Sequence, residues 1–350
     1  MIKIAVQKDS GSYWKSWEKR IIDSGHECVL LDLRKSSEFD KALRFDGVMW
    51  HIDMKPSMQS AASSVLSSLE IGARKPVFPN LETRWHFDNK VSQAYLFKQM
   101  GIVTPETNIF WNEEDAMHWV HNQCEFPVVA KLKRGAGSTA VYILRNQQDA
   151  ERYTRRMFSL KGISGEAGGA KRSPYRIWRD FARNSVLHLP RPILQEFLKQ
   201  RPRLREIWPN ERGYAYFQEF MPANDFDTRI TVIGNRAFAF RRFNRDGDFR
   251  ASGSGKIDYS VKGINMEMVR IAHNISLQNN FQSMAYDFLI DKEGKPTIVE
   301  ISYAYQSKAV FDCPGHWDRE LNWIDGHVLP EAAHVEDFIE EIEKSQKGKH

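Results

Sequence analysis

Two short apolar runs, residues 285–290 and 297–301, are separated by the polar sequence Asp-Lys-Glu-Gly-Lys-Pro. Runs of this length on either side of turn residues predict a β-hairpin. Each run carries one carboxylate, Asp287 in the first and Glu300 in the second. Buried carboxylates are costly unless they are paired or bound to a cation, and two on adjacent strands offer the oxygen ligands that magnesium prefers. From the hairpin alone, two interpretations are equally good. The acids either bind magnesium together, or they contact solvent or arginine as ordinary residues of a sheet.

The chain has 350 residues, of which 41% are hydrophobic and 12% aromatic, so it can bury the cores of two or three packed lobes. No apolar run approaches the length of a membrane span, and the first residues lack the basic-then-apolar pattern of a signal peptide. Its three cysteines (28, 124 and 313) are scattered and are not spaced for zinc. These features predict a cytoplasmic protein in a reducing compartment.

Positive charge is concentrated in one segment, residues 151–212. This segment contains 15 Lys or Arg against 6 Asp or Glu, a balance of +9 in a chain whose net charge is +5. Its first half lacks sustained periodicity, and its second half mixes Trp178 with several arginines. Three interpretations stay open, namely a solvated helical face, a nucleic-acid-binding surface and a lid over an anionic substrate. Nucleic acid is less favoured than the solvated face, which is the more common explanation of such charge.

The first 80 residues alternate short apolar strands with amphipathic helices. Strands are predicted at 2–6, 28–33, 45–52 and 77–80. Glycines at positions 25 and 72 end the two helices predicted between them. This alternation indicates a small parallel α/β lobe, and the dinucleotide-binding pattern G-x-G-x-x-G is absent from it.

Two lysines accompany features that favour phosphate binding. Lys90 lies near the start of a helix predicted at 86–100, where a positive charge opposes the helix dipole and needs a partner or a function. Lys131 lies near the end of a strand predicted at 126–132, and a glycine-rich turn follows at 133–140. Small residues in such a turn let backbone N–H groups approach an anion, and the lysine adds a point charge. Neither lysine is diagnostic by itself, since solvated lysines and ordinary glycine turns are common.

Three further strands are predicted after the basic segment, at 214–221, 227–233 and 236–243. Asp227 and Arg229 share one face of the second of these strands, because side chains alternate along a strand. A second loop of small residues and a helix then lead into the carboxylate-bearing hairpin. The order of these marks along the chain is more specific than any one of them.

Six marks follow one another: Asp88 and Lys90 at a helix start, Lys131 before glycines, Gln218-Glu219-Phe220-Met221, Asp227-Thr228-Arg229, Arg250-Ala251-Ser252, and Asp287 with Glu300-Ile301-Ser302. This series resembles the ATP-grasp ligase superfamily, closest to its ribosomal-protein-modifying (RimK-type) and glutathione-synthase-like branch. The resemblance covers nearly the whole chain and implies an α/β and α+β fold. A parallel α/β lobe would occupy residues 1–80. Two α+β lobes, at 81–217 with the insertion 151–212 and at 218–350, would clamp ATP.

The resemblance also implies the roles of individual residues. The implied nucleotide-binding residues are Lys90, Lys131, Gly135, Gly137, Ser138, Gln218, Glu219, Phe220 and Asp227. The implied ligands of Mg²⁺, or of Mn²⁺ in its place, are Asp287, Glu300 and Ser302. The residues implied in catalysis are Lys131, Arg242, Arg250 and Ser252. Serine stands at 252 and 302 where the superfamily usually has asparagine, and a hydroxyl group is shorter than an amide. We therefore expect one metal ion to be held less tightly.

The implied reaction activates a carboxylate with ATP as an acyl phosphate, which an amine then attacks to form an amide. The expected substrates are a small-molecule or glycan carboxylate and an amine, with an anionic acceptor recognised by residues 151–212. An acidic sugar of a cell-surface polysaccharide precursor would fit that resemblance. A nucleotide-binding sensor or scaffold without turnover is one alternative, which the two serines support, and a nucleic-acid-binding protein is the other. The sequence leaves the oligomeric state open, a homo-oligomer included.

Overall fold

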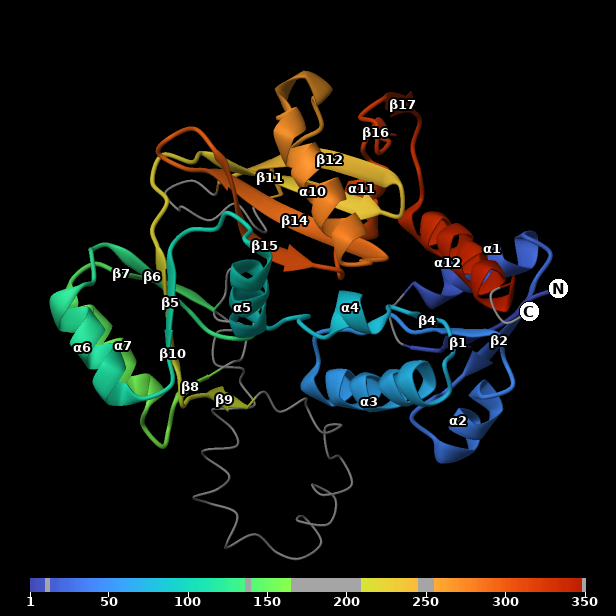
Figure 1. Cartoon of the computed structure of the whole chain (residues 1–350), viewed down its shortest axis with the longest axis horizontal. Helices are drawn as coiled ribbons and strands as arrows, with labels where there is room; N and C mark the ends of the chain where they lie inside the picture. Colours follow the sequence, from blue (N-terminus) through green and yellow to red (C-terminus); the bar gives the residue numbers. More distant parts are fainter. Residues whose placement is uncertain (10–12, 136–139, 165–208, 245–254, 348–350) are drawn as a thin grey trace, which may run out of the picture.

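A computed structural model describes residues 1–9, 13–135, 140–164, 209–244 and 255–347. Three main β-sheets, at the right, the left and the top of the view in Figure 1, form the frame of the molecule. Helices cover their outer faces. The architecture combines one parallel α/β sheet with two antiparallel sheets, as the sequence predicts.

The first sheet is parallel, with its strands in the order β2-β1-β3-β4. These strands are β1 (Lys3–Gln7), β2 (Glu27–Leu31), β3 (Gly47–Met49) and β4 (Val77–Phe78). The connecting helices are α1 (Trp14–Asp23), α2 (Ser36–Ala42) and α3 (Pro56–Ser67), the last of which continues as a π-helical turn at Ser68–Gly72. Pro56 occupies the first turn of α3, where its missing N–H costs nothing.

Helix α12 (Pro330–Lys347), although last in sequence, packs against α1 and the first sheet (Figure 1). Its buried side chains join a cluster with Ile4, Val6 and Trp17. Gly47 in β3 permits this close packing, since a Cβ there would lie 2.7 Å from Ile342 Cδ1. The sequence predicts this helix only at 335–345, so the observed helix begins five residues earlier. The core of the N-terminal lobe therefore includes residues from the other end of the chain.

The second sheet is antiparallel, in the order β5-β10-β6-β7. Its strands are β5 (Thr107–Phe110), β6 (Val128–Lys131), β7 (Val141–Leu144) and β10 (Ala215–Glu219). Helices α6 (Glu113–Asn122) and α7 (Gln147–Met157) pack on it around Phe217. Strand β10 arrives from beyond the basic segment and inserts between β5 and β6.

Helix α7 corrects one expectation, because the basic segment 151–212 does begin with regular periodicity. The helix starts at Gln147, before the segment, where Asn146 accepts a hydrogen bond from the N–H of Asp149. Its buried residues Ala150, Tyr153, Thr154 and Met157 follow the helical repeat. The charged segment begins at residue 151, so it contains only the second part of this helical repeat, which is too short to recognise. Residues 165–208, which carry most of the segment's charge, lie outside the described part of the chain.

The third sheet follows the order β15-β14-β11-β12-β16-β17, with β13 beside β12. Its strands are β11 (Phe226–Ile233), β12 (Arg236–Phe243), β13 (Ile257–Asp258), β14 (Ser283–Ile290), β15 (Pro296–Ser302), β16 (Gly315–Trp317) and β17 (Trp323–Asp325). The predicted hairpin of β14 and β15 is present. Helix α10 (Met266–Gln278) covers the face that carries Ile230, Val232 and Tyr286. The opposite face is left for polar residues at one end of the sheet.

Helices α4 (Leu81–Arg84) and α5 (Lys90–Met100) connect the first sheet to the second. The remaining short elements are α11 (Ser307–Phe311), a 3-10 turn at Val261–Gly263, and a two-stranded sheet of β8 (Ile163–Ser164) and β9 (Asn210–Glu211). Helix α5 begins at Lys90, not at the predicted residue 86. The Asn89 side chain caps it by accepting the N–H of Ser92, and the backbone of Asp88 is left-handed, with φ +50°.

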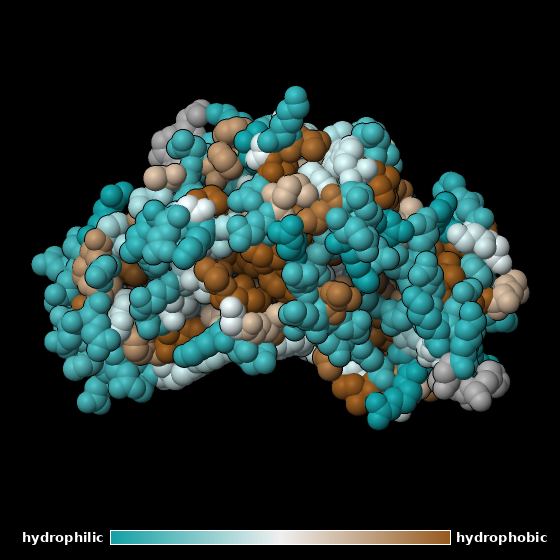
Figure 2. All heavy atoms as spheres, turned by 45° about the horizontal axis from the view of Figure 1, so that its top comes forward, coloured by the Kyte–Doolittle hydropathy of each residue, from teal (hydrophilic) through white to brown (hydrophobic). Residues whose placement is uncertain are grey.

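The view in Figure 2 shows a largely hydrophilic face with apolar residues gathered in a hollow near its middle. Among the helices in the described ranges, none is both long enough and apolar enough to cross a membrane.

The packing of α12 gives a stability prediction. Replacement of Phe338 by Ala removes a buried ring from the cluster shared by α12 and the first sheet. We expect this change to lower the free energy of unfolding by about 3–5 kcal/mol, because a cavity replaces the lost contacts. Urea unfolding monitored by circular dichroism measures it. Leu160, which is 91% exposed, supplies the control, and Leu160→Ala should change stability by less than about 0.5 kcal/mol. Equal effects of the two changes would contradict the packing described here.

Candidate nucleotide-binding and catalytic site

A cleft of about 900 Å³ lies where residues of all three sheets converge. Polar lining residues come from strand β6, from Asp88 just before α5, from the end of β10 and from one face of the third sheet. The first lobe contributes His51, Asp53 and Met54, which follow the carboxyl end of β3. Ligands of open α/β sheets commonly bind at that end of the strands. Clefts of this size hold a nucleotide-sized ligand.

The floor of the cleft is a set of alternating charges on the third sheet. Strand pairing sets Asp227 opposite Arg242, and Arg229 opposite Asp287. Because directly opposed side chains share a face, all four groups meet on one side of the sheet. Asp287 in turn lies opposite Glu300 on β15.

Both aspartates make paired hydrogen bonds with arginine. Arg242 donates from Nε and one terminal nitrogen to the two oxygens of Asp227, at 2.7 Å each. Arg229 binds Asp287 in the same way, at 2.6 and 2.7 Å. Arg242 also reaches Asp287, at 2.8 Å. Burial raises the pKa of Asp287, but the two guanidinium groups outweigh it and hold that pKa below its ordinary value.

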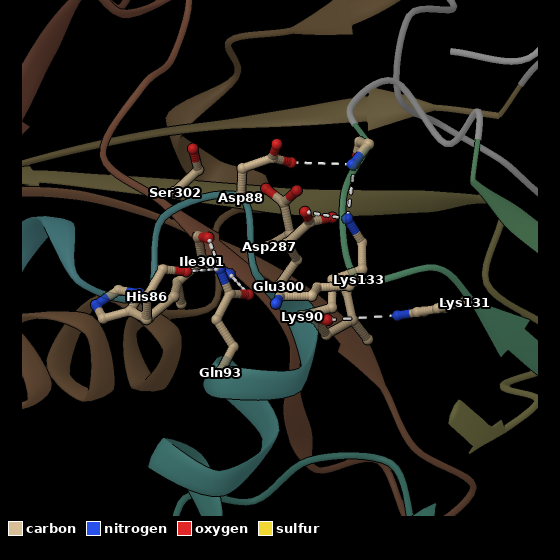
Figure 3. Close-up of polar contacts among 12 residues, drawn as sticks. His86, Asp88, Lys90, Gln93, Lys131, Lys133, Asp287, Glu300, Ile301 and Ser302 are labelled. Atoms are coloured by element: carbon tan, nitrogen blue, oxygen red, sulfur yellow. Dashed lines mark hydrogen bonds and ion pairs between the residues drawn. The ribbon is translucent and has the colours of Figure 1, made fainter. Parts of the chain in front are cut away.

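Two lysines approach Glu300 from other elements (Figure 3). Lys90, the first residue of α5, places Nζ 3.0 Å from Glu300 Oε1 and 2.7 Å from the carbonyl oxygen of Gly135. Lys131 ends β6, and its Nζ lies 3.5 Å from the carbonyl oxygen of Val299. Burial lowers the pKa of Lys131 to about 8, an effect that the carboxylate of Glu300 opposes. The ammonium groups of Lys90 and Lys131 thus lie beside the part of β15 that carries Val299 and Glu300.

An irregularity in β15 exposes this end of the strand to the cleft. The pairing with β14 shifts after Asp287, so that Glu300 is opposite Asp287 while Ile298 is opposite Phe288. The extra residue, Val299, is a β-bulge. Both Val299 and Glu300 therefore line the cleft. The hydroxyl group of Ser302, two residues further, donates to the carbonyl oxygen of Ala304 at 2.9 Å.

Three of the predicted nucleotide-binding residues, Gln218, Glu219 and Phe220, line the cleft where β10 ends. The amide nitrogen of Gln218 donates inward, to Thr107 Oγ1 at 2.9 Å and to the hydroxyl of Tyr216 at 3.2 Å. The amide nitrogen of Gln218 is therefore hydrogen-bonded to residues of the second sheet itself. Apolar residues from β6, β7, β14 and β15 line the same cleft, namely Val129, Val141, Leu289 and Val299. Apolar lining together with a few polar groups suits a planar base.

The structure brings most of the predicted residues into this one cleft. The cleft residues among them are Lys131, Gly135, Gln218, Glu219, Phe220, Asp227, Arg242, Asp287, Glu300 and Ser302. Lys90 joins them through Glu300 and Gly135. Four predicted residues lie outside the described part of the chain, namely Gly137, Ser138, Arg250 and Ser252.

Three sets of site residues were not among the predicted nucleotide-binding, metal-binding or catalytic residues. Arg229 binds Asp287, and its period-two spacing from Asp227 was the available signal. Asp88 contacts Gly135 from an unusual backbone conformation that no sequence pattern reveals. The cleft residues His51, Asp53 and Met54 carry no motif at all.

The carboxylates suit a hard cation that arrives with phosphate oxygens. Among the described residues, Glu300 has one oxygen that no lysine or arginine contacts at short range, and Oδ1 of Asp287 accepts one hydrogen bond. Within the same ranges, no group of three or more His, Cys, Asp or Glu could hold a metal ion without further ligands. Magnesium commonly uses one or two carboxylates together with phosphate and water. The residues present therefore fit Mg²⁺ bound jointly with a nucleotide.

Neither protein-family profiles nor curated proteins match the sequence. Solved structures do match. A RimK domain ATP-grasp protein from Sphaerobacter thermophilus is 15% identical, covering 96% of this chain and 99% of its own, at a TM-score of 0.54. N5-carboxyaminoimidazole ribonucleotide synthetase from Thermotoga maritima is 14% identical, covering 97% and 76%, at 0.56. The ATP-grasp ligase PsnB, complexed with a minimal precursor, Mg and ADP, is 12% identical, covering 97% and 98%, at 0.55. At these identities the likeness is one of fold, and the chain has the ATP-grasp fold.

Proposed function

We propose that this protein is an ATP-dependent carboxylate–amine ligase. The observation that carries the proposal is that Lys131 and Glu300 line one cleft while Lys90, from a third element, pairs with Glu300 at 3.0 Å. Two cations beside a carboxylate form the charge pattern that a metal-bound polyphosphate requires. The fold similarity supports this reading, since structures of ATP-grasp ligases cover nearly the whole chain.

The nucleotide would lie along the cleft from β10 to β15. Its base would sit against the segment 218–220, and Asp227 lies on the floor beyond it, where a ribose would pass. Its phosphates would extend towards Lys90 and Lys131, which supply positive charge at the end of the cleft near Glu300. Asp287 and Glu300 would hold Mg²⁺ on the other side of the phosphates.

Phosphoryl transfer to a carboxylate needs positioning and charge neutralisation more than a covalent partner. Bound Mg²⁺ would polarise the transferred phosphoryl group. Lys131 would neutralise charge that develops on the phosphate oxygens. Arg242 would keep Asp227 and Asp287 in place, since it touches both. The resulting acyl phosphate would react with an amine, and no nucleophilic side chain is required.

The substrates are not fixed by the fold. The similar structures bear different names, among them D-cycloserine synthetase and an N5-carboxyaminoimidazole ribonucleotide synthetase. We propose an anionic acceptor, such as an acidic sugar, because the segment 151–212 carries a balance of +9. Neutralising Arg201, Arg203 and Arg205 should then raise the KM of the acceptor, and an unchanged KM would remove this part of the proposal.

Turnover tests the proposed activity. The full chain, incubated with Mg-ATP and an extract of cellular metabolites, should release ADP and form amide products that mass spectrometry identifies. Lys131→Ala and Glu300→Ala should each lower ADP release at least about a hundredfold, because each removes charge stabilisation of the transferred group. Lys295→Ala, at an exposed turn where the lysine pairs with Glu293, is the control and should keep full activity. Binding of Mg-AMPPNP without ADP release would identify a nucleotide sensor instead.

The pKa of Lys131 predicts a pH dependence of nucleotide binding. Burial lowers this pKa to about 8, and the ammonium form that attracts phosphate is lost as the pH rises through it. We expect the Kd of Mg-AMPPNP to rise above pH 8, by up to about tenfold per pH unit. Isothermal titration calorimetry between pH 7 and pH 10 measures it. Lys131→Arg stays charged throughout and should show a nearly flat profile. Equal slopes for wild type and Lys131→Arg would show that another group controls binding.

A further inference from the structure

Asp88 adopts a backbone conformation that is uncommon for residues other than glycine. Its φ of +50° belongs to the left-handed region, which most L residues enter rarely and which aspartate and asparagine enter more often than the others. It is also buried, with 7% of its surface exposed, directly before the cap of α5. Burial raises the pKa of its carboxyl group. An acid that is both buried and strained in its backbone needs contacts that offset these costs.

The carboxylate of Asp88 connects three elements. Oδ1 accepts the backbone N–H of Gly135 at 2.9 Å, and Oδ2 accepts the side-chain amide of Gln59 at 3.3 Å. Gln59 lies in α3 of the first lobe, and Gly135 begins the glycine-rich turn after β6. The left-handed backbone of Asp88 directs its side chain to both partners.

Gly135 is held by both of its backbone polar groups. Asp88 takes its N–H, and Lys90 Nζ donates to its carbonyl oxygen at 2.7 Å. A third hydrogen bond joins the same two segments, from the backbone N–H of Lys90 to the carbonyl oxygen of Lys133 at 2.9 Å. If Lys90 turns towards a phosphate, Gly135 loses the second of these bonds. The bond from Asp88 does not depend on Lys90 and remains.

We propose that Asp88 is a positioning residue for the phosphate site. Its carboxylate fixes Gly135 against the start of α5 and against α3, so that the backbone of Gly135 keeps a set position beside Lys90. This inference rests on the proposed function, because it assigns the place beside Gly135 and Lys90 to the phosphates of a nucleotide. The acceptor oxygen of Asp88 is the essential group, and its negative charge is not.

Two substitutions separate the hydrogen bond from the backbone strain. Asp88→Asn keeps an acceptor oxygen, and asparagine tolerates positive φ well. Asp88→Gly relieves the strain completely and removes the acceptor. Arg74→Gly is the matched control, since Arg74 is exposed in the first lobe and has φ +52°. A residue that served only the backbone turn would tolerate glycine without loss.

Hydrogen exchange of the peptide that contains Gly135 tests the anchor in the protein alone. Asp88→Gly should exchange this amide at least about tenfold faster than wild type, whereas Asp88→Asn and Arg74→Gly should match wild type. Calorimetry with Mg-AMPPNP should show about tenfold weaker binding for Asp88→Gly and nearly unchanged binding for Asp88→Asn.

The outcomes decide separately on the anchor and on the proposed function. Wild-type exchange of Gly135 in Asp88→Gly would overturn the anchor. Equal weakening of nucleotide binding in Asp88→Asn and Asp88→Gly would overturn the assignment to the acceptor oxygen. If the wild-type protein failed to bind Mg-AMPPNP, the proposed function would fail, and the exchange comparison would still decide whether Asp88 holds Gly135.

Discussion

The cleft depends on charge pairing across strands β11, β12 and β14. A carboxylate at the position of Asp287 or Asp227 has little contact with water, and an unpaired charge there would cost several kcal/mol. Arg229 and Arg242 compensate both acids through paired hydrogen bonds of 2.6–2.8 Å. The pairing leaves the floor of the cleft close to neutral, while the two lysines and Glu300 lie at its end. A polar surface can therefore exist next to an apolar core in one sheet, whose opposite face packs under α10.

The same pairing shapes how this sheet can bind ions. Asp287 is shared by two guanidinium groups, so a cation that reaches it must compete with bonds already formed. Among the described residues, Glu300 forms an ion pair only with Lys90, and it lies beside a bulge of β15. The hydroxyl group of Ser302 donates its hydrogen bond locally, to the carbonyl oxygen of Ala304 just after β15. In the proposed complex, Mg²⁺ would therefore bind Glu300 more readily than Asp287, although both carboxylates face the cleft.

Local patterns in the sequence predicted the elements that carry the site. The hairpin of β14 and β15, the strand before the glycine-rich turn and the strand pair β11–β12 all follow from alternation and turn residues, and the structure contains them. Contacts between distant segments were harder. Lys90 was singled out by its conflict with the helix dipole, but its partner Glu300, 210 positions away, follows only from tertiary packing. The left-handed backbone of Asp88 and the cleft residues 51–54 leave no mark in composition or periodicity. The start of α7 was missed because its repeat begins outside the segment that the charge pattern defined.

The packing of α12 on the first sheet has a consequence for biosynthesis. The strands and helices of the N-terminal lobe leave the ribosome first, yet one face of their sheet is completed by Val335, Phe338 and Ile342. Domains usually fold as they emerge, in order of synthesis. The core of this lobe is instead complete only once residues 335–342 have been synthesised, so apolar surface stays exposed until then. Its folding is therefore coupled to the synthesis of α12, more than 250 residues after its last strand.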